Sequence, residues 1–303
     1  MDIYLPIAGQ SVNALLIVLL GFIVGLLSGM FGVGGGFLTT PLLIFYGIPP
    51  TVAVASASTQ ITGASVSGVM VHLRRGGVDI KMGSVMIAGG LFGSVFGAAL
   101  FRLLQASGQI DVVIGLLYVL ILGWIGGLML IDSLKALGYV QMTAPDPARA
   151  RHNRWVASLP LRWRFYASGV YVSPVAPLAL GFLVGVLTVF LGIGGGFILV
   201  PAMIYLLGMP ARVVVGTSLV MILAVSAATT MVHSLTTRAV DVVLAGLLLV
   251  GGVVGAQYGA MLTTRLKPDL LRLALAIIIL LVALRVLLGL AWRPDEIFSI
   301  EYL

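Results

Sequence analysis

The sequence predicts an all-α polytopic membrane protein built from two inverted repeats of about five helices each. Of the 303 residues, 60% are hydrophobic and only 9% are charged, whereas a soluble domain carries about 25% charged residues. The apolar runs reach about 20 residues, the length that a helix needs to cross a bilayer, and they do not alternate as the strands of a barrel would. A glycine-rich segment at residues 32–37 recurs at residues 192–197, which indicates the repeat.

The expected helices of the first half follow one another along the chain. They cover about residues 11–30, 37–46, 51–72, 82–103 and 110–131. The second is short, since ten helical residues reach only ~15 Å, so it stops halfway or re-enters. A polar and basic linker, rich in arginine and proline, follows. The predicted domains are an N-terminal transmembrane repeat at 1–131, the linker at 132–166 and a C-terminal transmembrane repeat at 167–303.

Several motifs recur at an offset of 160 to 162 residues. The matching segments are 32–37 with 192–197, 47–49 with 208–210, 71–72 with 232–233, 78–79 with 240–241, and the glycines of 89–97 with those of 251–259. So small a drift over most of the chain indicates an internal duplication. The glycines spaced by four residues are typical of close packing between membrane helices.

The basic residues indicate how the repeats lie in the membrane. With the linker in the cytoplasm and five crossings per half, thirteen of the 17 Lys and Arg residues fall on the cytoplasmic side and four on the other, which follows the positive-inside rule. The loop at 74–81 is basic, whereas its counterpart at 234–241 is nearly neutral. Equivalent loops therefore face opposite sides, as in inverted repeats, and the net charge of +7 reflects cytoplasmic loops rather than nucleic-acid binding.

The two glycine clusters are the main candidate for a functional site. A phosphate loop would end in Gly-Lys-Ser/Thr, but phenylalanine stands there in both copies. Helix packing is one explanation, although it requires one glycine per turn rather than three in succession. The other is a helix break near the membrane midplane, whose free N–H groups and positive dipole end attract an anion. This site would include Gly34, Gly35, Gly36, Phe37, Gly194, Gly195, Gly196 and Phe197.

A hydroxyl-rich stretch in the helix after each short element is the second candidate. Its members are Ser56, Ser58, Thr59 and Gln60 in the first half and Thr217 and Ser218 in the second. These side chains can donate hydrogen bonds to an oxyanion, or they can bond back to carbonyls of their own helix. His72 and His233 end matching helices, each shortly before an aspartate. They are candidates for gating or proton relay, or for interfacial caps.

The residues that the sequence lacks exclude several classes of site. There is no cysteine, so disulfides, thiolate metal sites and cysteine nucleophiles are excluded. No glutamate precedes Glu296, and the aspartates fall at expected helix ends or in loops. A membrane enzyme would require intramembrane carboxylates or a metal cluster, and a cation-coupled carrier usually keeps an acid in the membrane. We therefore expect no enzymatic activity, no cofactor and no metal.

These motifs resemble those of the sulfite exporter TauE/SafE family over nearly the whole chain. The resemblance rests on Gly-x-Gly-Gly-Gly-Phe-x-x-x-Pro in both halves, on Gly-Ile/Met-Pro before the next helix, on Gly216-Thr217-Ser218 and on residues 72–79. The first half departs from the pattern, with Ala55-Ser56-Ala57 where the family usually shows Gly-Thr-Ser.

The resemblance implies a secondary transporter in the inner membrane of a bacterium. It would export small sulfur-containing anions, such as sulfite or the organosulfonate sulfoacetate, by alternating access. Its partners would be the anionic substrate and the lipid bilayer, and a homo-oligomer is left open. The alternative functions are an anion channel, an uptake permease for another small oxyanion and, less favoured, a membrane-embedded enzyme.

Overall fold

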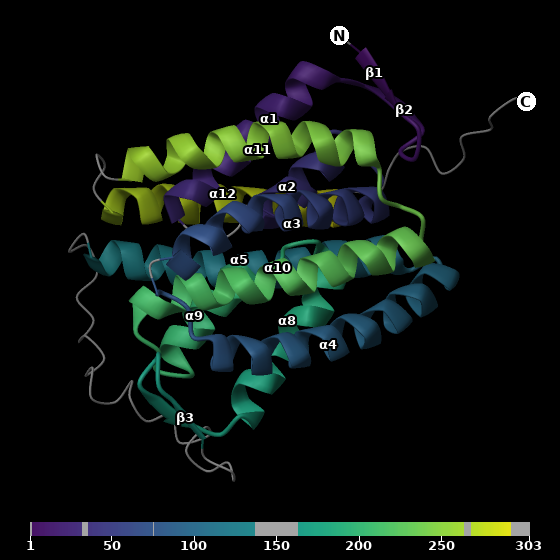
Figure 1. Ribbon diagram of the computed structural model, residues 1–303. Helices are drawn as coiled ribbons and strands as arrows, with labels where there is room; N and C mark the ends of the chain where they lie inside the picture. The colour runs from purple at the N-terminus through teal and green to yellow at the C-terminus, as the bar shows by residue number, and fades with distance from the viewer. Residues whose placement is uncertain (1, 32–35, 75, 137–162, 264–267, 292–303) are drawn as a thin grey trace, which may run out of the picture.

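The computed structural model describes residues 2–31, 36–74, 76–136, 163–263 and 268–291. Helices dominate these residues, and the described part of each half contains five of them (Figure 1). The first half forms α1 (Ala14–Phe31), α2 (Gly36–Phe45), α3 (Pro50–Arg74), α4 (Ile80–Ala106) and α5 (Ile110–Ala136). The second forms α8 (Val175–Leu191), α9 (Gly196–Tyr205), α10 (Ala211–Thr236), α11 (Val242–Thr263) and α12 (Pro268–Ala291). The predicted all-α polytopic fold is confirmed.

The helices differ in whether they can cross a membrane. Within the described residues, five helices (α4, α5, α10, α11 and α12) are long and apolar enough to do so. Helix α3 is 25 residues long, but its serines, threonines and glutamine make it less apolar. Helices α2 and α9 have ten residues each, which is about 15 Å, so neither spans a bilayer alone. The short helices expected at the glycine clusters are therefore confirmed.

In each half, one β-hairpin precedes the first helix. Strand β1 (Asp2–Leu5) pairs with β2 (Gln10–Asn13), and β3 (Trp163–Phe165) pairs with β4 (Val170–Val172), both antiparallel. Their turns contain Gly9 at φ +68° and Gly169 at φ +67°, a left-handed conformation that glycine adopts without strain. The sequence led us to expect a helix from about residue 11 and a linker through residue 166, and strands occupy these positions instead. The internal repeat thus extends to the hairpins.

Rows of glycines, which we call glycine seams, join helices of the two halves. One seam lies between α1 and α11 (Gly21, Gly25, Gly251, Gly255 and Gly259), and the other lies between α4 and α8 (Gly89, Gly93, Gly97, Gly181 and Gly185). Helix α1 runs parallel to α11, and α4 runs parallel to α8, so each pair combines one helix from each half. A Cβ atom on Gly25 would lie 2.2 Å from the carbonyl oxygen of Gly252, and one on Gly93 would lie 2.1 Å from that of Phe182. Because only hydrogen fits there, the backbones approach closely, as small residues permit between membrane helices. The packing explanation of these glycines is confirmed.

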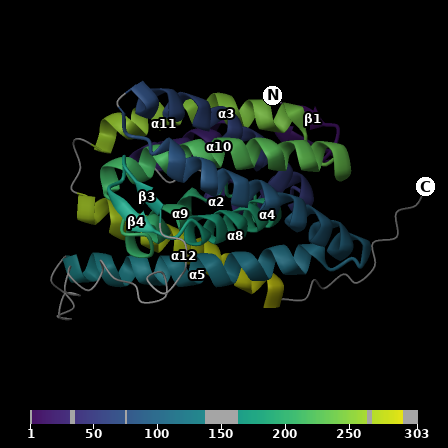
Figure 2. The same ribbon diagram turned by 60° about the horizontal axis from the view of Figure 1, so that its bottom comes forward.

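Equivalent helices of the two halves run antiparallel to each other. Thr59 and Thr62 of α3 lie beside Thr230 and Ser226 of α10, with Oγ–Oγ distances of 3.4 and 3.1 Å. The start of α5 likewise lies beside the end of α12, since a Cβ atom on Gly115 would be 3.1 Å from the side chain of Leu290. Helices α11, α3, α10 and α4 form one layer, α5 and α12 lie behind it, and the short helices lie between (Figures 1 and 2).

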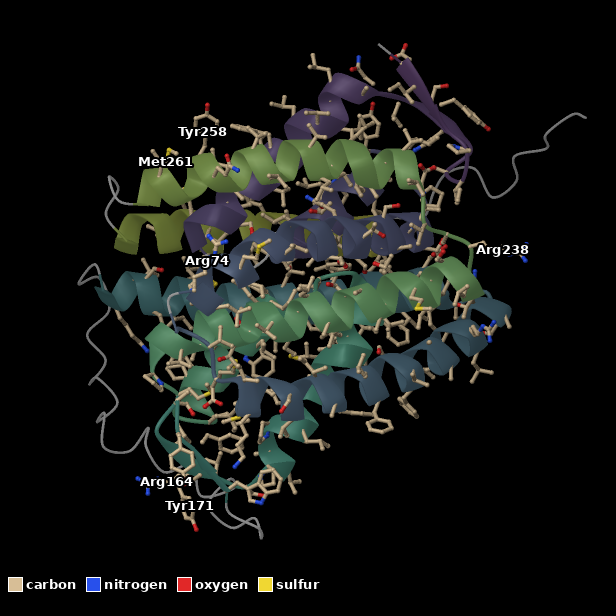
Figure 3. All side chains as sticks on the ribbon, viewed as in Figure 1. Arg74, Arg164, Tyr171, Arg238, Tyr258 and Met261 are labelled. Atoms are coloured by element: carbon tan, nitrogen blue, oxygen red, sulfur yellow. The ribbon has the colours of Figure 1, made fainter. Side chains whose placement is uncertain are left out.

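The outer surface is strongly apolar. Exposed side chains include Phe92 on α4 and Trp124 on α5, with exposed fractions of 71% and 72%. Arg74 and Arg164 lie at one end of the helix bundle and Arg238 lies at the other (Figure 3). An apolar belt with charged groups at its ends is the arrangement expected of a multi-pass membrane protein.

Candidate functional site

The described part of the first glycine cluster contacts the second cluster. Gly36 and Phe37 begin α2, and Phe197 follows the cluster that begins α9. The rings of Phe37 and Phe197 stack with centroids 4.7 Å apart and an interplanar angle of 5°. A Cβ atom on Gly36 would lie 2.6 Å from the carbonyl oxygen of Gly192. The structure therefore brings the starts of α2 and α9 together, while Gly34 and Gly35 lie outside the described residues.

The break between α8 and α9 contains three glycines in the left-handed conformation. Gly192, Gly194 and Gly195 have φ values of +63°, +68° and +76°, which a side chain would make strained. A Cβ atom on Gly194 would also lie 2.8 Å from Ile61 and 3.0 Å from Ile222, two residues at equivalent positions in α3 and α10. The whole segment from Gly192 to Phe197 is buried. Its three-glycine cluster thus serves a helix break rather than simple packing.

Side chains from other helices satisfy the carbonyl groups at the end of α8. The backbone N–H of Gly192 donates to the oxygen of Thr188 at 2.8 Å. His233 places its Nε2 3.0 Å from the oxygen of Val189, and the hydroxyl of Tyr118 on α5 donates to the oxygen of Leu191. The last carbonyls of a helix have no partner within it. Three carbonyl groups at the end of α8, those of Thr188, Val189 and Leu191, therefore have partners.

Among the described residues, no side chain caps the donor groups at the start of α9. Gly195 caps the helix without a side-chain hydrogen bond, and the backbone bonds among the described residues resume only at Ile198 N–H, which donates to Gly195. A helix N-terminus with free N–H groups carries a partial positive charge. The break thus presents backbone donors at the start of α9 and partnered carbonyls at the end of α8, and such donors favour an anion over a cation.

Thr40 adds a buried hydroxyl to this break. Its Oγ1 lies 3.2 Å from the position that a Cβ atom on Gly192 would occupy. It lies near the Tyr118 hydroxyl, but no described atom meets hydrogen-bonding geometry with it. A buried hydroxyl without a partner is costly, by about 1–3 kcal/mol, and is therefore uncommon unless a ligand or water satisfies it. The counterpart of Thr40 in the second half is Val200.

The structure distributes the predicted hydroxyl groups over several faces of α3 and α10. Ser56 Oγ accepts a hydrogen bond from Asp241 N at 3.3 Å, and Thr217 Oγ1 accepts one from Asp79 N at 2.9 Å. Ser58 and Ser218 donate to carbonyls of their own helices, as the alternative explanation predicts. Thr59 does the same and also contacts α10. These residues do not form one cluster.

Gln60 faces α11 rather than the glycine break. Its Nε2 donates to the carbonyl of Leu248 at 3.4 Å, and a Cβ atom on Gly252 would lie 2.8 Å from that nitrogen. Its Oε1 is buried and has no partner among the described atoms. The neighbouring residue Ile61 is the one that contacts the break.

Two histidines take different positions in the described structure. His233 is buried, and its ring meets that of Phe101 edge-on with centroids 5.0 Å apart. His72 lies in the last turn of α3 and is half-buried. His233 therefore contacts the end of α8 through its ring.

Several residues of the break were missed by reasoning from the sequence. Thr40 could have been found by comparing the repeats, because Thr39-Thr40 stands where the second half has Leu199-Val200. Ile61 and Ile222 could have been found as an equivalent pair. Tyr118 carries no local signal, since its contact with Leu191 joins positions 73 residues apart.

Comparison with known proteins agrees with this architecture. The family model described as "Sulfite exporter TauE/SafE" matches residues 17–286. A "Probable membrane transporter protein YjnA" of Bacillus subtilis is 32% identical over 275 residues, which cover 89% of this chain and 98% of that protein. A "Probable membrane transporter protein" of Xylella fastidiosa is 28% identical, covering 90% of this chain and 93% of its own length.

A more local match is found in a plant protein. "Sulfite exporter TauE/SafE family protein 6" of Arabidopsis thaliana is 47% identical over 51 residues, which are 16% of this chain and 12% of that protein. No solved structure matches the chain. The family model covers most of the sequence, the bacterial relatives cover nearly its full length, and the fold is that of a polytopic membrane protein. The chain therefore belongs to the sulfite exporter TauE/SafE family of membrane transporters.

Proposed function

We propose that the protein is a secondary transporter that exports small sulfur-containing anions, such as sulfite or sulfoacetate, by alternating access. The observation that carries this proposal is the polarity of the break between α8 and α9. Tyr118 and His233 occupy carbonyl oxygens at the end of α8, while α9 begins without a side-chain cap. An oxyanion would accept hydrogen bonds from the free N–H groups there.

We assign the substrate site to Gly36, Phe37, Thr40, Gly194, Gly195, Gly196 and Phe197. The Thr40 hydroxyl would donate a hydrogen bond to the anion, and the stacked phenylalanines would separate the two ends of the pathway. Gly34 and Gly35 remain part of this assignment on the basis of the repeat alone. Burial of Gly192–Phe197 favours a carrier in a closed state over an open anion channel.

We further propose that the two halves are inverted in the membrane, with the central linker in the cytoplasm. The antiparallel contacts of α3 with α10 support this proposal, because equivalent helices of parallel repeats would run in the same direction. Arg74 and Arg164 lie at the end of the bundle opposite to Arg238 (Figure 3). Export of an anion is favoured by an inside-negative potential, by roughly 2.3 kcal/mol per charge per 100 mV, so it requires no coupled ion.

Transport in liposomes tests the function directly. Purified protein should move labelled sulfite or sulfoacetate with saturable kinetics, and sulfate and taurine should be compared as competitors. Unitary currents would indicate the channel alternative, and chemical conversion of the anion would indicate an enzyme. If none of the four compounds binds or moves, the sulfur-anion assignment is wrong.

Replacement of Thr40 tests the site without destabilising the fold. Thr40→Val places the residue of the second half at this position and removes a buried hydroxyl, so stability should be unchanged or higher. Loss of a hydrogen bond to a charged ligand corresponds to about 1.5–3 kcal/mol, or roughly 10- to 100-fold in transport efficiency. Thr40→Ser keeps the hydroxyl and should retain most transport. Equal activity in both variants would remove Thr40 from the site.

A further inference from the structure

Two buried carboxylates occupy equivalent positions in the repeats. Asp79 caps α4 through its Oδ1, which accepts from Met82 N at 3.0 Å. Asp241 caps α11 through its Oδ1, which accepts from Leu244 N at 3.1 Å. The exposed fractions of the two residues are 2% and 0%. Hydrogen bonds stabilise both carboxylates, and no ion pair to either is found among the described residues.

The second oxygen of each carboxylate binds the hairpin of the other half. Asp79 Oδ2 accepts from Ser168 N at 3.0 Å and from Ser168 Oγ at 2.7 Å. Asp241 Oδ2 accepts from Ile7 N at 3.1 Å. Ser168 lies in the β3–β4 turn and Ile7 in the β1–β2 turn. Each aspartate therefore links its own repeat to the start of the other.

The backbone of each aspartate makes a further bond between the halves. Asp79 N–H donates to Thr217 of α10, and Asp241 N–H donates to Ser56 of α3. These hydroxyl oxygens act as acceptors from the backbone of the other half. We name the group Asp241, Ile7 and Ser56 the first latch, and the group Asp79, Ser168 and Thr217 the second latch.

Each latch holds a hairpin whose buried apolar residue packs into the core at one end of the molecule. Leu5 of β1 and Phe165 of β3 are fully buried, whereas Tyr4 and Trp163 beside them are exposed. Leu5 belongs to the same buried hydrophobic cluster as Ala53 at the start of α3, and Phe165 belongs to the same cluster as Val214 at the start of α10. The two hairpins lie at opposite ends of the helix bundle (Figures 1 and 2).

We propose that Asp79 and Asp241 are positioning residues whose latches close the two ends of the pathway, one latch opening in each half of the transport cycle. This proposal rests on the proposed alternating access. The first latch has two bonds between the halves, of 3.1 and 3.3 Å, and the second has three, of 2.7 to 3.0 Å. The first latch therefore opens more readily.

Cysteine accessibility tests the latches without any substrate, because the chain has no cysteine of its own. Ala53→Cys reports on the core behind the first latch and Val214→Cys on the core behind the second. In detergent-solubilised protein, Ala53→Cys should react with a small maleimide faster than Val214→Cys. Asp241→Asn should accelerate labelling of Ala53→Cys at least threefold and leave Val214→Cys unchanged, and Asp79→Asn should do the reverse.

Asparagine is chosen because it keeps one oxygen for the helix cap and replaces the oxygen that binds the hairpin. If Asp79→Asn is not monodisperse, Ser168→Ala removes one bond of the second latch and leaves the cap intact. Ser84→Ala, on the exposed face of α4, is the control and should change neither reporter. Unchanged labelling in the aspartate variants, or equal acceleration of both reporters, would overturn the proposal.

The test separates this proposal from the assignment of substrate. Selective labelling together with liposomes that move no sulfur anion would leave the latches standing and remove the proposed substrate. Transport of sulfite together with unselective labelling would support the proposed substrate and overturn the latches. Both measurements use the full-length protein.

Discussion

At the scale of single residues, the glycine break depends on side chains that satisfy the end of α8. His233 contributes by placing Nε2 at hydrogen-bond distance from Val189, so this nitrogen carries the proton of the neutral ring. Thr237 Oγ1 lies 3.4 Å from its Nδ1. The buried imidazole stabilises the break by donating a hydrogen bond to a carbonyl at the end of α8. This role requires no change in the charge of the ring.

Replacement of His233 separates a cap from a proton relay. Glutamine can donate a hydrogen bond from its Nε2 to the Val189 oxygen, whereas phenylalanine leaves that carbonyl without a partner, which costs about 1–3 kcal/mol. We expect His233→Gln to retain most transport and thermal stability, and His233→Phe to lose both. Liposome uptake at pH 6 and pH 8 and thermal unfolding in detergent provide the measurement. A relay would be indicated if His233→Gln were as inactive as His233→Phe.

At the scale of elements, glycine seams decide how closely helices of the two halves approach. The α4–α8 seam is representative, because backbone atoms rather than flexible side chains would meet a Cβ atom on Gly93. A seam of this kind cannot adjust to an added methyl group without separating the helices.

Gly93→Ala should therefore destabilise the protein by about 1–3 kcal/mol, the usual effect of overpacking. Gly123→Ala in α5 is the matched control, since nothing lies within 4 Å of its Cβ position. Alanine favours a helix over glycine by about 1 kcal/mol, so this variant should be as stable as the unmodified protein or more so. Thermal unfolding of the detergent-solubilised variants checks both, and an equal loss in the two would argue against the seam.

At the scale of the whole molecule, the packing pattern relates the halves by an approximate two-fold axis. Helices α1 and α4 each pack against a helix of the other half, while α3 and α5 pack against their own equivalents. The stacked rings of Phe37 and Phe197 lie where the halves meet. Each half buries faces of α1, α3, α4 and α5 or their equivalents against the other half. The two repeats therefore form a single folding unit.

Inverted repeats predict that matching loops face opposite sides of the membrane. Arg74 ends α3, and Arg238 follows α10. In single-cysteine variants, Arg238→Cys should react with an impermeant maleimide in spheroplasts, and Arg74→Cys should react only after permeabilisation. Labelling of both from the same side would contradict the inversion.

Much of the architecture could be predicted from composition and from the repeat. Hydropathy determines which segments enter a bilayer, because the length of an apolar run can be read from the local sequence. Three consecutive glycines disfavour a continuous helix wherever they occur, so the short helices α2 and α9 follow from local sequence. The pairing of the two clusters also follows from the duplication, and the stack of Phe37 on Phe197 agrees with it.

Contacts between distant segments could not be predicted in this way. Ser56, Ser58, Thr59 and Gln60 are close in sequence, but a helix turns about 100° per residue, so they face different partners. Tyr118 and His233 reach α8 from positions 73 and 44 residues away. Local sequence therefore determines which elements form and where the helix breaks. Tertiary packing alone decides which side chains complete that break, because their positions depend on how the two halves meet.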